Sequence, residues 1–198
     1  MTDIIDFDTR LSKMSQNGDE EGKYQLRTEN NELKKSSRGF TGQGTATYDN
    51  NDVYEGDFID GHREGRGIYR YFKSGHKYEG EWKEDVKRGI GKMTYNGVGE
   101  YHGYWENGRR HGEGVFVYKN GDTYTGWWRH GEKEGYGTYL FKSTGMKMCG
   151  DWVNGSISTG KWVYPNGLFF EGSFENNKPK GQGTWTFKNG NVLHGTFE

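Results

Sequence analysis

The sequence predicts an all-β protein, an elongated and twisted single-layer antiparallel sheet of about seven consecutive β-hairpins, preceded by a short N-terminal segment. Three observations predict it. One five-residue sequence motif, here called a word, recurs seven times at steps of 22 to 24 residues. A second word with two glycines precedes each copy, and residues typical of turns lie between the two words. Self-similarity at a fixed period of this size is typical of repeat arrays.

The composition indicates a thin core made of aromatic rings. Only 30% of the 198 residues are hydrophobic and the mean hydropathy is −1.12, yet the chain has seven Trp, 14 Tyr and 11 Phe. Tyr and Trp bury large areas despite their modest hydropathy. The net charge of −1 gives no field that would attract nucleic acid, and no apolar run approaches the roughly 20 residues of a membrane span.

The word that closes each repeat has the form Tyr-x-Gly-x-Trp, with looser copies toward the C-terminus. The seven copies span residues 54–58, 78–82, 101–105, 124–128, 148–152, 170–174 and 193–197. Because strand side chains alternate, the two rings and the glycine share one face. The missing side chain is expected to leave room for a ring from a neighbouring strand, and pairs of rings across strands would offset the entropic cost of the glycine.

The word that opens each repeat is Gly-x-Gly followed by a ring, as in Gly112, Gly114 and Tyr118. Asn-Gly pairs such as Asn120-Gly121 lie between the two words and predict a tight turn. The predicted hairpins cover residues 42–58, 65–82, 89–105, 112–128, 135–152, 158–174 and 181–197, with polar connections such as residues 60–64 between them. The register stays open, because turns of two and three residues put different rings on one face.

The chain divides into an N-terminal extension, residues 1–39, and the repeat array, residues 40–198. An apolar stripe in the extension has helical spacing and consists of Ile4, Phe7, Leu11 and Met14. A helix over residues 3–14 would be too short to be stable alone, so we expect it to form on docking to a partner, with disorder as the alternative. Residues 15–39 are polar and are predicted to be a linker.

The two words together resemble the MORN repeat (membrane occupation and recognition nexus) over about residues 40–198. Residues 120–127 with 135–139, residues 152–155 and residues 177–183 are similar to the radial spoke head MORN proteins of motile cilia and flagella. Members of that group tend to start their repeats earlier and to continue into a charged tail, so this chain is either a short relative or one that ends early, at Glu198.

This resemblance implies a non-catalytic structural subunit of the axonemal radial spoke head that contributes to motility. It would be made in the cytoplasm and assembled into the axoneme of the cilium. Its partners would be other radial spoke head proteins in a multi-subunit complex, and a homodimer is also open.

Tryptophans are the candidate partner-binding residues, because one sheet cannot cover both of its faces and Trp is enriched at interface hot spots. The candidates are Trp82, Trp105, Trp127, Trp128, Trp152, Trp162 and Trp185, together with the N-terminal stripe. Trp127 and Trp128 are adjacent and should point to opposite faces. The alternative is that these rings pack only on neighbouring repeats.

A second function is a peripheral membrane or cytoskeletal scaffold that binds anionic phospholipid through basic residues of the connections between hairpins. These bases are Arg63, Lys87, Arg88, Arg109, Arg110, Lys133, Lys178 and Lys180. Acids such as Glu64 and Glu84 interrupt them, whereas membrane attraction needs a clustered basic patch. The balance of charge therefore favours protein partners, and the charged edge is expected to discourage strand addition.

The sequence contains no pattern that indicates catalysis, a cofactor or a metal site. The six His are scattered, and the single Cys149 offers no zinc-binding cluster. The Gly-x-Gly words are followed by strand-like patterns, whereas a dinucleotide site needs a helix there. We therefore expect neither an enzyme nor a small-molecule or nucleic-acid binder.

Overall fold

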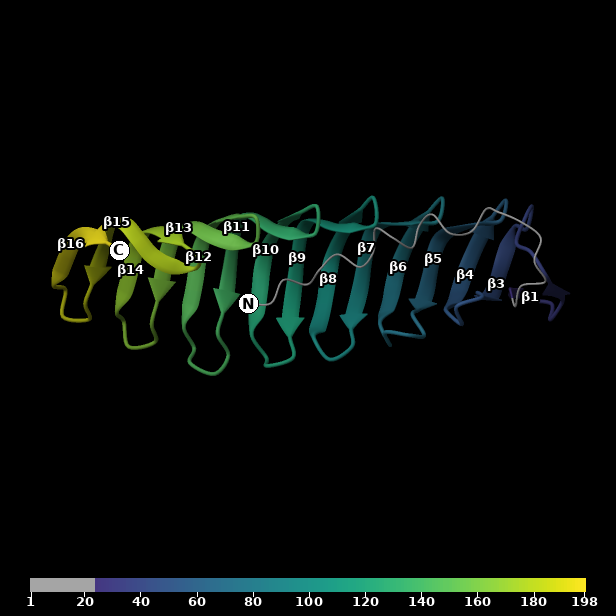
Figure 1. Cartoon of the computed structure of the whole chain (residues 1–198), viewed down its shortest axis with the longest axis horizontal. Coiled ribbons are helices and arrows are strands. Elements are labelled where there is room, and N and C mark those ends of the chain that lie inside the picture. The colour runs from purple at the N-terminus through teal and green to yellow at the C-terminus, as the bar shows by residue number, and fades with distance from the viewer. Residues whose placement is uncertain (1–23) are drawn as a thin grey trace. The chain divides into compact units, whose positions relative to one another are not determined.

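The computed structural model describes residues 24–198, and its regular structure there consists of β-strands with no helix (Figure 1). The strands are β1 (Gln25–Thr28), β2 (Leu33–Lys34), β3 (Gly42–Thr47), β4 (Val53–Ile59), β5 (His62–Arg70), β6 (Lys77–Lys83), β7 (Val86–Tyr95), β8 (Gly99–Glu106), β9 (Arg109–Tyr118), β10 (Thr123–Arg129), β11 (Glu132–Leu140), β12 (Lys147–Val153), β13 (Ser156–Val163), β14 (Phe169–Glu175), β15 (Lys178–Thr186) and β16 (Val192–Phe197). They form one open antiparallel sheet in chain order, with β1 between β3 and β2. The predicted fold class is confirmed.

The chain separates into two compact units. The first ends at Gly97 and also contains Tyr101–Arg109, and the second consists of Val98–Glu100 and Arg110–Glu198. The two are described separately below.

The seven predicted hairpins are present, but the tight turns lie elsewhere than predicted. The two-residue turns are in the connections between predicted hairpins, such as Asp60-Gly61, where both residues have positive φ (48° and 87°) as a type I′ turn requires. At Asn120-Gly121 only the glycine has positive φ, and its N–H donates to the carbonyl of Tyr118 in a longer loop. As a result, the first strand of hairpins two to seven begins two or three residues earlier than predicted.

In the second, third, fifth and seventh opening words the first glycine lies in a β-bulge, so it does not make room for a ring. Gly56 pairs with Gly67 and Asp57 pairs with Glu64, so Gly65 and the residue after it are extra on β5. Gly65 has a φ of 62°, a conformation that is costly for residues with a Cβ.

The second glycine of each opening word pairs with the central glycine of a closing word, and this fixes the register. At Gly67, Gly137, Gly160 and Gly183 the pairing extends to the closing words on both neighbouring strands. In the first unit this glycine row runs through Gly44, Gly56, Gly67, Gly80 and Gly91. In the second unit it runs through Gly114, Gly126, Gly137, Gly150, Gly160, Gly172, Gly183 and Gly195.

The glycine row exists because a tyrosine lies across it. A Cβ added at Gly67 would overlap the ring of Tyr54, and one added at Gly56 would come within 2.6 Å of Gly67 Cα. The Tyr54 hydroxyl crosses the row and donates to the carbonyl of Asp57 at 3.0 Å. Tyr78, Tyr101 and Tyr124 repeat this bond three residues along, at 3.0, 2.9 and 3.1 Å. The expectation that glycine makes room for a ring of a neighbouring strand holds for this second glycine.

Rings of successive repeats interlock over the glycines. Tyr54 meets Phe58 edge to face at 5.1 Å and Trp82 of the next repeat at 5.5 Å. In the second unit, Tyr124 meets Trp128 at 5.2 Å and Trp152 at 5.1 Å. Such edge-to-face pairs contribute roughly 0.5–1.5 kcal/mol beyond their buried area.

A buried aspartate in each unit ties one hairpin loop to the next. The carboxylate of Asp52 accepts the Tyr69 hydroxyl at 2.9 Å and the N–H of Phe72 at 2.8 Å. Asp122 makes the corresponding bonds with Tyr139 and Lys142. Neither residue was predicted from the sequence to have a role.

The N-terminal part of the described chain departs from the predicted linker. Residues Gln25–Thr28 and Leu33–Lys34 are strands, because β1 pairs with β3 and buries Leu26. The predicted helix over residues 3–14 lies outside the described residues. Within residues 24–198 no helix has the length and apolar character of a membrane span.

We predict that Gly67→Ala lowers the free energy of unfolding by roughly 1–3 kcal/mol, because the new methyl group must displace the Tyr54 ring. Gly195→Ala is the matched control, since it lies in the same glycine row but the atoms nearest to its Cβ would be 3.7 Å away. Thermal unfolding followed by circular dichroism measures both. Equal melting temperatures for the two variants would contradict the role given to the ring.

Candidate functional site

One face of each unit, here called the ring face, is closed by the protein's own aromatic side chains. Trp82 and Trp105 in the first unit and Trp128 and Trp152 in the second are all buried. Each indole N–H donates to a glycine carbonyl of an earlier strand, and the four N–O distances lie between 3.1 and 3.3 Å. Four of the seven tryptophans predicted to bind partners therefore pack on neighbouring repeats, which was the stated alternative.

The other three candidate tryptophans differ from one another. Trp127 is 51% exposed and points away from buried Trp128, as the alternation of the strand predicted. Trp162 stacks on Tyr164 at 5.5 Å, and Trp185 lies 5.3 Å from Phe170, so both are half-buried. Trp127 is therefore the most accessible of the predicted rings, while the N-terminal stripe lies outside the described residues.

A row of cations, Arg63, Lys87, Arg110 and Lys133, covers the ring face near the two-residue turns, and we call it the cation row. In the first unit Arg63 Cζ lies 4.5 Å from the Trp82 ring and Lys87 Nζ lies 5.0 Å from the Trp105 ring. In the second, Arg110 and Lys133 lie 4.4 and 4.7 Å from the rings of Trp128 and Trp152. Each cation thus covers the tryptophan of its own repeat, in the geometry of a cation–π contact.

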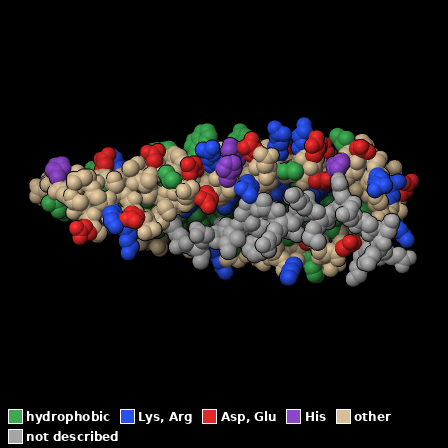
Figure 2. Space-filling view, turned by 45° about the horizontal axis from the view of Figure 1, so that its top comes forward, with side chains coloured by type: hydrophobic (Ala, Val, Ile, Leu, Met, Phe, Trp, Pro, Cys, Tyr) green, Lys and Arg blue, Asp and Glu red, His purple; other side chains and the backbone are tan. Residues whose placement is uncertain are grey.

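Half of the eight bases of the predicted basic edge belong to the cation row and are largely buried. Lys87 is 5% exposed, Arg110 and Lys133 are each 8% exposed, and the Arg63 side chain is 15% exposed. Arg88, Lys178 and Lys180 are exposed, and Arg109 is half-buried. Figure 2 shows acidic and basic side chains mixed over the visible part of the described surface. The basic edge is therefore not the continuous stripe that lipid binding would favour.

The phenols of the ring face keep their protons. Burial raises the pKa of Tyr48 to about 12, and the charge of nearby Arg63 lowers it only in part. Burial also raises the pKa of Tyr54 and Tyr124. These hydroxyls consequently remain hydrogen-bond donors at any physiological pH.

A small charged cluster joins two adjacent turns of the first unit. The Asp85 carboxylate accepts the Arg63 N–H and Nε–H at 2.9 Å, and its other oxygen lies 2.7 Å from His62 Nδ1. Burial alone would raise the pKa of Asp85, but the hydrogen bonds and charge of Arg63 together with His62 lower it overall. The bond to Asp85 and its charge raise the pKa of His62.

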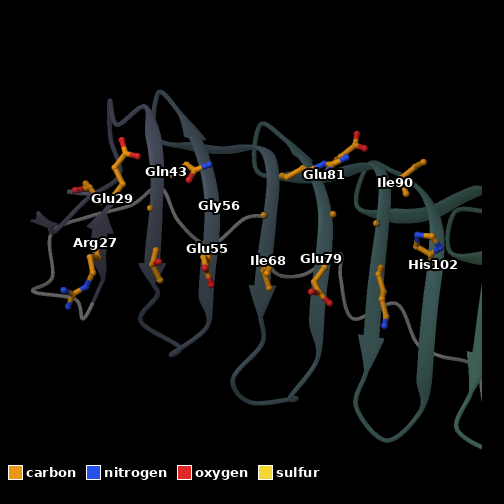
Figure 3. A pocket seen from close by; sticks show the side chains of 18 residues that line it. Arg27, Glu29, Gln43, Glu55, Gly56, Ile68, Glu79, Glu81, Ile90 and His102 are labelled. Carbon is orange, nitrogen blue, oxygen red and sulfur yellow. The ribbon is translucent and has the colours of Figure 1, made fainter. Parts of the chain in front are cut away.

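The face opposite the rings, here called the open face, carries a groove in the first unit. The groove encloses about 720 Å³, and the glycine row forms its floor. Figure 3 shows side chains on both sides of this floor, with Glu55, Ile68 and Glu79 in one row and Gln43, Glu81 and Ile90 in the other. Its walls carry both signs of charge and two isoleucines, a surface suited to a peptide segment more than to a small molecule.

Ile90, Tyr104 and Tyr136 on the open face are large, apolar and exposed, and none of them was among the candidates predicted from the sequence. They occupy the variable x positions of the two repeat words, whereas the predicted partner-binding rings were all tryptophans. A comparison of these x positions among the seven repeats would have identified them.

A family model described as the MORN repeat matches residues 54–75, 78–97, 101–123, 124–146 and 170–192, which is more than half of the chain. The chain belongs to the MORN-repeat family. MORN repeats are a non-catalytic, scaffold type of repeat, so the protein is a protein-interaction scaffold. The unmatched stretch from residue 147 to 169 contains the looser copy at Met148–Trp152. No curated protein sequence matches this MORN-repeat protein closely enough to be counted as a relative.

Solved structures similar to this MORN-repeat protein include two from Drosophila melanogaster Sas-4. One is the TCP domain of SAS-4 (dCPAP) in complex with a proline-rich motif of Ana2 (dSTIL), at 17% identity and a TM-score of 0.48, covering 79% of this chain and 84% of that one. The other is the TCP10c domain, at 17% identity and a TM-score of 0.44, covering 78% and 93%. At these values the likeness carries no information on function.

We predict that Lys133→Glu lowers the free energy of unfolding by about 3 kcal/mol, since it replaces a buried cation over rings with a buried carboxylate. Lys73→Glu is the control, because Lys73 lies in an exposed loop and surface changes are usually within about 0.5 kcal/mol. Denaturant unfolding compares the two. If Lys133→Glu unfolds at the wild-type midpoint, the cation row does not stabilise the ring face.

We also predict that Asp85→Asn returns the pKa of His62 toward about 6.5, its ordinary value. The raised pKa means that protonated His62 stabilises the folded chain below about pH 6.5, and that this contribution is lost as the pH rises through the folded-state pKa. Titration of the histidine ring protons by NMR measures the shift, and His194 serves as the internal control. An unchanged His62 titration in Asp85→Asn would show that Asp85 does not set it.

Proposed function

We propose that this MORN-repeat protein is a non-catalytic structural subunit of the radial spoke head, in the axoneme of motile cilia and flagella. The sequence of residues 120–127 with 135–139, 152–155 and 177–183 supports this location, because it resembles the radial spoke head members of the family. The resemblance implies a place between the central pair and the dynein arms. Other radial spoke head proteins would be its partners, with a homodimer as a further possibility.

The observation that carries the scaffold role is the contrast between the two faces of each unit. The ring face uses its large side chains to hold consecutive repeats together. The open face has large side chains that are exposed, among them Ile90 in the first unit and Trp127 in the second. A face that is not needed for the fold is available to partners.

The alternative of a peripheral scaffold on anionic lipid has less support. Four of the eight bases on which it rests form the cation row. A base already buried over an aromatic ring would have to leave that ring before it could approach a lipid headgroup.

We predict that a tagged copy expressed in a motile ciliated cell stays with the axoneme after detergent has removed the membrane, because its partners would be axonemal proteins. Western blotting of the detergent-soluble and axonemal fractions measures this. Axonemes from cells that lack radial spokes are the control, and they should have lost the tagged chain. Recovery in the detergent-soluble membrane fraction, or on axonemes without spokes, would contradict the proposal.

A further inference from the structure

Two exposed aromatic side chains lie on adjacent strands of the open face in the second unit. Trp127 on β10 is 51% exposed and Tyr136 on β11 is 63% exposed, and we call them the ring pair. Rings of this size are normally buried in a protein that has no partner for them.

The seven repeats supply an internal test of whether the fold needs these rings. Trp127 is the residue after the central glycine of its closing word, and the same position in the other repeats holds Asp57, Glu81, Tyr104, Asp151, Ser173 and Thr196. Tyr136 lies between the two glycines of its opening word, and the same position elsewhere holds Gln43, Arg66, Ile90, Glu113, Thr159 and Gln182. Since small and polar residues serve both positions in otherwise similar hairpins, the fold does not require a ring at either.

Both members of the ring pair belong to one bulge between β10 and β11. Gly126 pairs with Gly137 and Trp128 pairs with Lys133, so Trp127 alone faces the three residues from Glu134 to Tyr136. A Cβ added at Gly135 would lie 3.6 Å from the Cβ of Trp127, which shows how closely this backbone approaches the tryptophan. The bulge therefore places Trp127 beside the backbone of Gly135, the residue that precedes Tyr136, and gives both exposed rings to the same bulge.

Acids flank the ring pair on both sides. Glu113 on β9 is the registered neighbour of Trp127, and Asp151 on β12 is the registered neighbour of Tyr136. Both are exposed, and one oxygen of Asp151 accepts the hydroxyl of Thr159 at 3.3 Å.

The surface beside the glycine row carries few other charges. Glu134, in the bulge opposite Trp127, is a third acid whose carboxylate accepts the N–H of Asn154 at 3.2 Å, and Lys147 is an exposed base further along β12. On the other side of the row, β9 to β12 carry Val115, Thr125, Thr138 and Cys149. The nearest base along β10 is Arg129, which pairs with Glu132, and Lys161 on β13 is in an ion pair with Glu171 at 3.1 Å. The four strands thus present the order acid, ring, ring, acid.

We propose that this acid-ring-ring-acid surface binds an extended segment of a partner protein that carries two arginines about four residues apart. Glu113 and Asp151 are three strand spacings apart, which is about 14 Å. An extended chain covers this span in about four residues. The two arginines therefore reach the two carboxylates while the intervening residues cross the ring pair.

Arginine fits this surface better than lysine. Its planar guanidinium can form paired hydrogen bonds with a carboxylate and stack on an aromatic ring at the same time, whereas the lysine ammonium acts as a point charge. The order of charge and rings therefore selects for two arginines, and acidic segments are repelled by both ends of the surface.

The test uses the full chain and a synthetic peptide, Ser-Arg-Ser-Gly-Ser-Arg-Ser. Binding is followed by NMR at the arginine signals of the peptide, which report on every variant, and in the wild-type chain also at the tryptophan indole N–H groups. We expect a saturable shift of the Trp127 indole, with a dissociation constant on the order of 1 mM or tighter. The double variant Trp127→Ser, Tyr136→Thr takes the residues found at Ser173 and Thr159, so its melting temperature should stay at the wild-type value. We expect it to bind the peptide at least about tenfold more weakly.

Three controls separate this surface from general attraction. Phe72→Ser removes a ring in the first unit that is 69% exposed, more than either member of the ring pair, and should leave binding unchanged. A peptide with Glu in place of Arg should not bind, and the variant Glu113→Gln, Asp151→Asn should weaken the Arg peptide at least about tenfold. The proposal is overturned if no peptide produces a saturable shift, if the double ring variant binds as tightly as wild type, or if neutralising the acids has no effect. These measurements do not depend on where the protein resides in the cell.

Discussion

The tyrosine that lies across a pair of glycines is the contact on which the rest of the structure depends. Tyr54 covers Gly56 and Gly67, and its hydroxyl reaches the carbonyl of Asp57. Because the ring needs the space of two side chains on adjacent strands, the glycines must pair, and this pairing fixes the register of each hairpin on the next. The same ring then supports the tryptophan of the following repeat. Repeats in such an array are stabilised mainly by their neighbours, since each one alone lacks a core.

This packing gives the two faces different roles. The residues that the fold demands, namely the glycines, the rings and the cations above them, belong to the ring face or to the turns. The open face has to fit only the sheet, so its side chains are free to differ from one repeat to the next. Variation among repeats is then informative in itself: a ring such as Trp127 in a position that elsewhere holds Asp57 or Ser173 indicates a role outside the fold.

Several residue assignments were wrong for one reason: the type of a residue does not show whether its side chain faces solvent or packs on the sheet. Tryptophan and arginine are enriched at interfaces, so Trp82 and Arg63 were natural candidates for partner and lipid binding. In the structure they contact each other, at 4.5 Å from guanidinium carbon to ring centroid. Without the register, a sequence cannot tell whether a base beside a turn reaches solvent or bends over a ring. The two-residue turns determine where Arg63 lies. Because the turn is short, β5 begins at His62 instead of the predicted residue 65, and Arg63 pairs with Phe58.

By itself, the sequence determined the fold class, the seven hairpins and the alternation that puts Trp127 and Trp128 on opposite faces. These follow from local rules: a 23-residue period, a two-residue alternation and the preference of turns for glycine and asparagine. Tertiary structure alone decided the register, the bulge at Gly65, the burial of Asp52 and the cation row. Each of these depends on how far one strand is shifted along the next. That shift is set by the Tyr54 ring, which lies over Gly56 of its own word and also over Gly67 of the next strand, and this second contact joins two different words.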